Sequence, residues 1–312
     1  MASLQKAEEL WFSPDVVILR ADTRIFRVFA AILKAQSSVF ADMFTFPQPP
    51  SAEMESIDGF PVVELHDKPE DVEVFLKAIF DSRFFSCHRR PKLNMIMRWV
   101  SFASRTNTTC RICALDHLGP IFPTHLTRYD DRESSDWPLT AVNIDRRFAA
   151  IRTATEVGAL WLLPVAYYDL CRQDMQRLIS NESWKDFGED LQRACLIGHS
   201  AQRQHLLKIL GFLYVVKQSG GSCRDWTVCN TVRLTAVSTP VLSAHSAYPV
   251  DIWGDQNWLT LKEAELCNSC LAESKALHAA ARQEFWDQLP QMFGLPGWAE
   301  LEEMKRVGLS VR

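Results

Sequence analysis

Four cysteines in the last third of the chain have the residue type and spacing to bind a metal ion. They form two pairs, Cys223-x5-Cys229 and Cys267-x2-Cys270. Structural zinc is held in a tetrahedron of cysteine or histidine ligands, with Zn–S distances of about 2.3 Å. Residues three apart on a helix share a face, and the first pair lies in a Gly/Ser-flanked loop that could fold back onto the second. We therefore predict a structural zinc site at Cys223, Cys229, Cys267 and Cys270.

Two other interpretations of these cysteines are open. The C-x5-C spacing is longer than in the usual zinc pair, so Cys267 and Cys270 could instead be buried apolar residues, with no common role for the loop cysteines. A disulfide is less favoured, because the count of nine cysteines is odd and no signal-peptide pattern begins the chain. Both features predict a reducing, intracellular location, in the nucleus or the cytoplasm.

The remaining cysteines are weaker candidates for chemistry. Cys110-x2-Cys113 has metal-binding spacing, but its only potential partners are Cys87 and His88. Cys171 and Cys195 stand alone in apolar surroundings, where cysteine usually serves as a small buried hydrophobe.

Catalytic motifs are missing from the sequence. It contains no Gly-x-Ser-x-Gly, no Walker-type glycine-rich loop, no dinucleotide-binding fingerprint and no His-Glu-x-x-His. The eight histidines are scattered along the chain. We predict no catalytic residues, no cofactor-binding residues other than the candidate zinc ligands, and no enzymatic activity.

Composition restricts the class of partner. The 312 residues carry a formal net charge of −4, so a strongly basic nucleic-acid binder is not indicated. Two short basic clusters, Arg89-Arg90 and Arg146-Arg147, are typical of solvated surfaces. No uninterrupted apolar run reaches about 18 residues, which argues against a membrane span. The length suits two domains.

The N-terminal third shows an alternation of short strands and helices. Strands are predicted at 15–19 and 24–29, followed by one amphipathic helix over 32–44. A third strand is expected at 62–65, after a Pro/Ser/Glu-rich loop. Pro69 then begins a helix, since proline and acidic residues are favoured in a first turn.

The rest of the chain shows mainly helical patterns. A polar stretch at 130–136 is expected to be the linker between domains. Helical stripes follow at 148–162, after which Pro164 should break or kink the helix, and at 191–216. Thr260-Leu-Lys-Glu263 has the form of a capping box, which predicts a helix running to Leu289.

Several segments together resemble the BTB/POZ domain. The first are Asp15-Val-Val-Ile-Leu-Arg20, Val39-Phe-Ala-Asp-Met-Phe44, Gly59-Phe-Pro-Val-Val-Glu-Leu-His-Asp67 and the stretch 70–85. With Phe122-Pro-Thr-His-Leu126 and the segments 156–168 and 285–296, the whole chain resembles BTB-domain proteins abundant in mushroom-forming fungi. The resemblance is weakest over 86–115. It also departs at Phe29-Ala30, where such domains usually carry histidine followed by lysine or arginine.

The resemblance implies a fold and a type of partner. The fold would be α+β, with a BTB/POZ domain at 12–127, made of a small sheet with helices, followed by a mainly α-helical domain at 140–312. BTB domains bind proteins and catalyse nothing, so we expect a homodimeric adaptor or scaffold. A cullin-type ubiquitin ligase is one partner that the resemblance suggests, with the client held by the C-terminal domain.

An alternative function is a nuclear transcriptional or chromatin regulator. In that case the cysteine quartet would shape a nucleic-acid-binding element, which needs clustered basic residues beside it. The sequence offers few there: Arg224, Arg233, Lys262 and Lys275.

Overall fold

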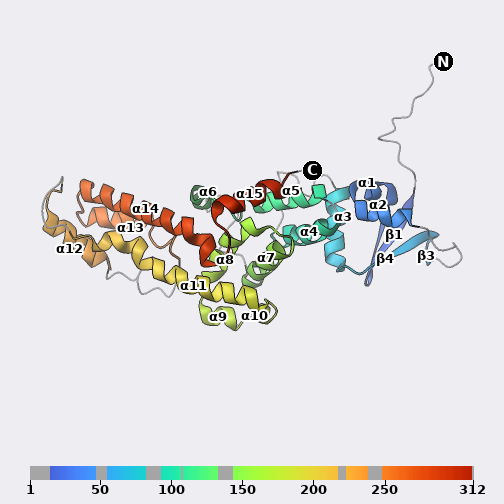
Figure 1. The fold of residues 1–312 in the computed structure, drawn as a ribbon, viewed down its shortest axis with the longest axis horizontal. Helices are drawn as coiled ribbons and strands as arrows, with labels where there is room; N and C mark the ends of the chain where they lie inside the picture. Colours follow the sequence, from blue (N-terminus) through green and yellow to red (C-terminus); the bar gives the residue numbers. More distant parts are fainter. Residues whose placement is uncertain are drawn as a thin grey trace, which may run out of the picture. The chain divides into compact units, whose positions relative to one another are not determined.

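The computed structural model describes residues 15–46, 55–81, 93–106, 108–132, 143–216, 223–237 and 248–310, without the side chains of 105–110. The chain divides into two compact units, Met1–Leu118 with Leu309–Arg312, and Gly119–Gly308. A small sheet with helices is followed by helices alone, which confirms the predicted α+β class (Figure 1). The boundary between the units lies between Leu118 and Gly119, earlier in the chain than the predicted linker at 130–136. Helix α6 (Leu126–Arg132) therefore belongs to the second unit.

The first unit contains a four-stranded sheet in the order β2-β1-β4-β3. The strands are β1 (Val16–Ala21), β2 (Arg24–Phe29), β3 (Ser56–Ile57) and β4 (Phe60–Leu65). β1 pairs antiparallel with β2 and parallel with β4. Strand β3 was not predicted, because its two residues lie in a Pro/Ser/Glu-rich stretch that has the composition of a loop. Asp58 and Gly59 join it to β4 with φ of 53° and 79°, the geometry of a tight hairpin turn.

One face of this sheet packs against helices. Val17, Leu19 and Ala21 alternate inward along β1. They pack with residues of α1 (Ala30–Gln36), α2 (Ser38–Thr45) and α3 (Pro69–Phe80). Phe75 of α3 is fully buried, with its ring centroid 4.5 Å from that of Phe102. Pro69 occupies the first turn of α3, as predicted.

The single helix predicted over 32–44 is wrong in one respect. The structure has two helices, α1 (Ala30–Gln36) and α2 (Ser38–Thr45), separated by Ser37 in an extended conformation. The Ser37 hydroxyl accepts a hydrogen bond from the Phe40 backbone N–H at 3.4 Å and so caps α2. Serine favours this capping role over a helix interior, which explains the break in an otherwise continuous apolar stripe.

The segment where the BTB resemblance is weakest contains two helices, α4 (Leu93–Thr106) and α5 (Thr108–Leu118). In α4 the buried residues Leu93, Ile96, Met97 and Val100 recur at helical spacing, so one face of the helix packs into the core. The basic stretch 88–92 lies outside the described residues.

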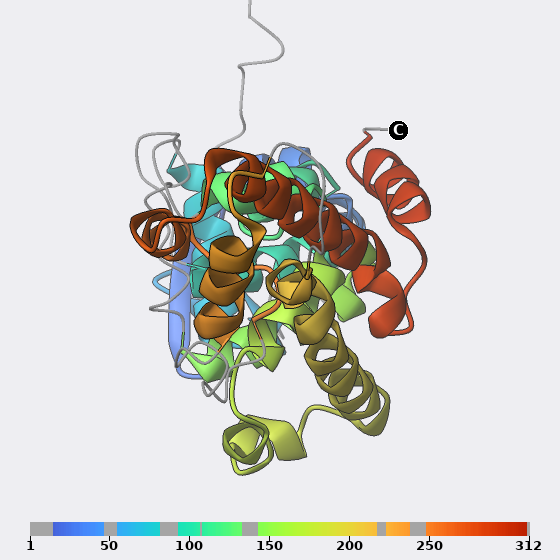
Figure 2. The same ribbon diagram turned by 90° about the vertical axis from the view of Figure 1, so that its left-hand side faces the viewer.

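The second unit is helical throughout its described residues (Figure 1). α11 and α14 run alongside each other, and α12 and α13 lie at the end of the unit that faces the viewer in Figure 2. The elements after α6 are α7 (Ile144–Glu156), η3 (Leu160–Leu162), α8 (Leu163–Cys171), α9 (Met175–Ile179), α10 (Glu182–Lys185), α11 (Glu189–Ile209), η4 (Leu210–Tyr214), α12 (Trp226–Val237), α13 (Asp255–Glu263), α14 (Asn268–Met292) and α15 (Trp298–Gly308). Among the described residues, no helix is both long and apolar enough to cross a bilayer.

Two predicted helix boundaries in this unit are wrong. Pro164 does not break a helix but lies in the first turn of α8, and α7 ends before Gly158, whose φ is 71°. Thr260 does not begin a helix either: it lies inside α13, where its hydroxyl donates to the Gln256 carbonyl at 2.9 Å. The long helix α14 begins after Cys267 instead.

Pro290 was expected to end the long helix, but it lies inside α14. A proline within a helix leaves the carbonyl four residues earlier without its partner. That carbonyl belongs to Trp286, and it accepts a hydrogen bond from the Trp298 indole N–H at 2.7 Å. The tryptophan of α15 thus replaces the missing backbone donor, so the helix continues to Met292.

A buried network of charged side chains lies in the core of the second unit. The Arg132 guanidinium donates to both carboxylate oxygens of Asp169, at 2.9 and 3.0 Å, and both side chains are 2% exposed. Arg147 donates to the backbone carbonyl of Asp169, and Arg172 lies 3.9 Å from its carboxylate. The network joins α6, α7 and α8 through one aspartate.

Candidate metal centre

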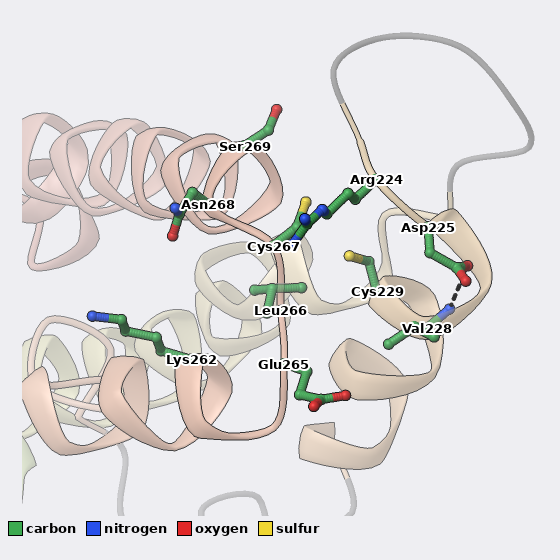
Figure 3. A pocket seen from close by; sticks show the side chains of 10 residues that line it. All are labelled: Arg224, Asp225, Val228, Cys229, Lys262, Glu265, Leu266, Cys267, Asn268 and Ser269. Atoms are coloured by element: carbon green, nitrogen blue, oxygen red, sulfur yellow. Dashed lines mark hydrogen bonds between the residues drawn. The ribbon is translucent and has the colours of Figure 1, made fainter.

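The beginning of α12 positions two of the four cysteines. Cys223 lies just before the helix. Cys229 lies in its first turn (Figure 3). Between them the Asp225 carboxylate accepts hydrogen bonds from the backbone N–H groups of Thr227 and Val228, at 2.9 and 3.1 Å. These bonds satisfy donors that a helix end leaves free, so they fix where the helix starts.

Replacing Asp225 by alanine should therefore lower the free energy of unfolding of this helix by about 1 kcal/mol, the usual value of such a cap. Hydrogen exchange of the α12 amides would measure the change. Asp225→Asn is the matched control, since an asparagine oxygen can accept the same bonds and should retain most of the protection. Equal losses in both variants would contradict the capping role.

The beginning of α14 positions the other two cysteines. Cys267 is the residue that precedes the helix, and Cys270 is its third residue. The Leu271 backbone N–H donates to the Cys267 carbonyl at 2.9 Å, which closes the first turn between the two cysteines. Both sulfurs consequently lie near the amino end of a 25-residue helix.

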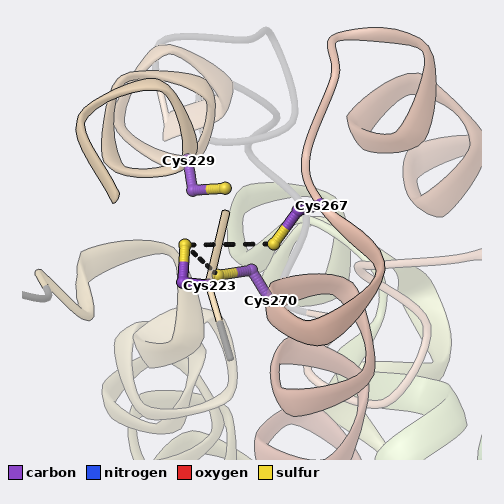
Figure 4. A group of neighbouring side chains, drawn as sticks. All are labelled: Cys223, Cys229, Cys267 and Cys270. Atoms are coloured by element: carbon purple, nitrogen blue, oxygen red, sulfur yellow. Dashed lines mark hydrogen bonds between the residues drawn. The ribbon is translucent and has the colours of Figure 1, made fainter. Parts of the chain in front are cut away.

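The four cysteine sulfur atoms lie close together. All lie within 4.8 Å of one another, with Cys223 Sγ 3.9 Å from Cys267 Sγ and 3.4 Å from Cys270 Sγ. The side chains point toward a common centre (Figure 4). A tetrahedron of thiolates around zinc places neighbouring sulfurs about 3.8 Å apart. The four cysteines are free thiols at distances that suit a metal ion.

Helix ends and burial act differently on the four thiols. The backbone N–H of Arg224, followed by that of Cys270, favours the thiolate of Cys267 and lowers its pKa to about 6. Burial raises the pKa of Cys229 and Cys270. A metal ion would reverse the effect of burial, because a coordinating thiol is deprotonated.

A hydrophobic core supports the cluster from behind. Cys229 and Cys270 pack with Leu266 and Trp253, and with apolar residues from η4 and α13. Arg233 of α12 is 1% exposed and donates to the Val215 carbonyl at 2.9 Å and the Cys270 carbonyl at 3.4 Å. The guanidinium thus connects α12 to the first turn of α14, independently of the sulfurs.

On its outer side the cluster opens into a hollow of about 690 Å³ (Figure 3). Cys229 and Cys267 both line it. The charged residues of its lining are two basic and two acidic: Arg224, Lys262, Asp225 and Glu265. The hollow therefore has no excess of positive charge.

His278 of α14 lies in the aromatic core near the cluster, with ring centroids 5.5 Å from Phe212 and 5.4 Å from Trp258. Burial lowers its pKa from 6.5 to about 4. The unfolded chain binds this proton more readily than the folded chain, so protonation of His278 favours unfolding. The free energy of unfolding is therefore highest above pH 6.5 and decreases as the pH falls toward 4.

We expect the free energy of unfolding to fall by up to about 3 kcal/mol across that pH range because of His278. Denaturant titrations between pH 7 and pH 4 would measure it. His278→Phe keeps an aromatic ring without a titrating group, so its curve should be flatter. An unchanged slope in that variant would contradict the assignment.

The predictions for the cysteines outside the cluster can be compared with the structure one pair at a time. Cys113 is exposed, whereas Cys87, His88 and the side chain of Cys110 lie outside the described residues, so a second metal pair stays a prediction. Cys171 and Cys195 are fully buried, as expected, but they are not isolated: their sulfurs lie 3.5 Å apart. Their sequence separation gave no sign of this contact.

Comparison of the chain with protein-family models, with curated proteins and with solved structures gives no match. The candidate metal centre therefore stands on its own geometry.

Proposed function

We propose that the protein is a non-catalytic protein–protein interaction scaffold whose second unit is stabilised by a structural zinc ion. The observation that carries the zinc assignment is the convergence of four cysteine sulfurs within 4.8 Å. Four thiolate ligands leave no open position for substrate, which is typical of structural and not of catalytic zinc. Cys223 and Cys229 would hold the ion from the start of α12 and the segment before it, and Cys267 and Cys270 from the start of α14.

Metal analysis of the purified protein tests this assignment. We expect one zinc per chain, and cobalt substitution should give the absorption of a tetrahedral thiolate site. Cys270→Ser should lose the metal, whereas Cys195→Ser, at a buried cysteine outside the cluster, should retain it. A metal-free protein purified under reducing conditions would overturn the proposal.

The scaffold role draws support from the first unit. Strand β2 is at the edge of the sheet, and edge strands offer unpaired backbone groups to a partner. Ile25 and Phe29 of this strand are 54% and 50% exposed, on the face opposite the packed helices. An apolar edge of this kind is stabilised by burial against a second copy, and two-fold dimers are the commonest oligomers.

Size-exclusion chromatography with light scattering would test self-association. We expect a dimer, which the double variant Ile25→Lys with Phe29→Lys should convert to a monomer. Leu207→Lys, at a residue of the second unit that is 65% exposed, is the control and should remain dimeric. A wild-type monomer at micromolar concentration would contradict the homodimer.

A cullin-type ubiquitin ligase is the partner suggested by the resemblance to BTB proteins. Purified cullin should then bind the wild-type chain with a measurable affinity, and no binding would exclude the ligase adaptor but not the dimer. The alternative of a nucleic-acid-binding regulator gains no support from the cluster, because the acidic side chains of its hollow balance the basic ones.

A further inference from the structure

The four sulfurs of the cluster differ in their access to solvent. Cys229 and Cys270 are 2% and 0% exposed, whereas Cys223 and Cys267 are only partly buried. Cys267 also lines the 690 Å³ hollow, which is large enough to admit a small molecule such as hydrogen peroxide. Reaction with a small oxidant should therefore begin at Cys267.

The second accessible sulfur is close to the first. Cys223 Sγ lies 3.9 Å from Cys267 Sγ, and the two residues come from different segments of the chain, before α12 and before α14. A disulfide needs a sulfur–sulfur distance of about 2.05 Å, so a shift of roughly 2 Å would join them. Cys223 precedes its helix, so it can move without disturbing helical hydrogen bonds.

We propose that hydrogen peroxide oxidises Cys267 and Cys223 to a disulfide and thereby releases the zinc ion. This inference rests on the proposed zinc site and assigns it a redox response. The product keeps a covalent link between the segments that precede α12 and α14, but it leaves Cys229 without a bond to α14.

The reaction balances in two steps. The Cys267 thiolate attacks one peroxide oxygen, the O–O bond breaks, and a sulfenic acid and hydroxide form. The Cys223 thiolate then attacks that sulfur, the S–O bond breaks, the S–S bond forms and a second hydroxide leaves. Two thiolates lose two electrons, peroxide gains them, and zinc dissociates after losing two of its four ligands.

The chain contains an internal control for accessibility. Cys171 and Cys195 have sulfurs 3.5 Å apart, closer than Cys223 and Cys267, but both are fully buried. If distance alone decided oxidation, this buried pair would form a disulfide first. If access decides, it stays reduced while the cluster reacts.

The experiment treats the zinc-loaded full-length chain with one equivalent of hydrogen peroxide. Released zinc is followed with a chromogenic chelator, and disulfides are mapped by alkylation and mass spectrometry. We expect one zinc released per disulfide, a dominant Cys223–Cys267 disulfide, and Cys171 and Cys195 still alkylated as thiols.

A matched pair of variants tests the route through the hollow without removing a ligand. Asn268 lines the hollow, so Asn268→Trp should narrow it and slow zinc release by several-fold. Gln256→Trp places the same side chain at an exposed position of α13 outside that lining, and its rate should equal the wild-type rate.

The outcomes separate the two proposals. A purified protein without zinc overturns the zinc site itself. A zinc-loaded protein that retains its metal under peroxide, or that forms mainly another disulfide, overturns only the redox inference. Equal rates for Asn268→Trp and Gln256→Trp would exclude the hollow as the route of attack.

Discussion

Replacing Asp169 by asparagine is expected to lower the free energy of unfolding of the second unit by about 3–5 kcal/mol. The substitution keeps the shape of the side chain but removes the negative charge that faces Arg132 at 2.9 Å. The guanidinium cannot lose its proton at neutral pH and cannot reach water from its buried position. An uncompensated buried charge is among the largest penalties that a single substitution can cause.

The neighbours of Asp169 increase this effect. Arg147 is also buried, and Arg172 lies 3.5 Å from a second carboxylate, Asp251. Tyr129 donates to that same carboxylate at 3.0 Å, and burial raises the pKa of the tyrosine well above its usual value, so the hydroxyl remains a donor. With Asp169 neutralised, the positive charges of Arg132 and its neighbours Arg147 and Arg172 would be balanced less well.

Urea unfolding followed by tryptophan fluorescence would measure the change, because eight of the ten tryptophans belong to the second unit. Asp190→Asn is the control: it removes a carboxylate 2.8 Å from Arg193 on the surface, where such pairs contribute less than about 1 kcal/mol. Similar midpoints for both variants would mean that the buried network is not a determinant of stability.

The sequence predicted local features of this fold better than long-range ones. Strands β1 and β2 and the start of α3 at Pro69 are determined by residues within a few positions of each other. The predicted helix boundaries were wrong where a single serine or threonine could either start a helix or lie inside one. Ser37 caps a new helix in place of continuing the old one, and Thr260 bonds to its own helix in place of starting another.

The contacts that were missed join distant segments. Arg132 and Asp169 are 37 residues apart, and the polar context of Arg132 indicated a linker. Arg132 is buried where it meets Asp169 of α8 and the Ile121 carbonyl, and no local sequence pattern reports these contacts. The four cysteines could be grouped from sequence because zinc chemistry supplies a rule for residues far apart, whereas a buried ion pair has no such rule.

Removing zinc should release the end of the second unit that contains α12. An ion that binds only the folded state stabilises it by about 4 kcal/mol when free zinc exceeds the dissociation constant a thousand-fold. A strong chelator should therefore increase hydrogen exchange of the α12 amides and of the first turn of α14 by up to about a thousand-fold.

The same exchange experiment contains its own reference. Amides of β1, in the first unit, should exchange at the same rate with and without chelator, because that unit has its own core around Leu19 and Phe75. Cys270→Ser should resemble the chelated wild type and respond no further to chelator. The buried charge network around Asp169 contains none of the zinc ligands, so it should persist while α12 opens as a local unit. Unchanged protection of α12 after complete loss of zinc would show that the hydrophobic core and Arg233 suffice, and that the metal does not stabilise the fold.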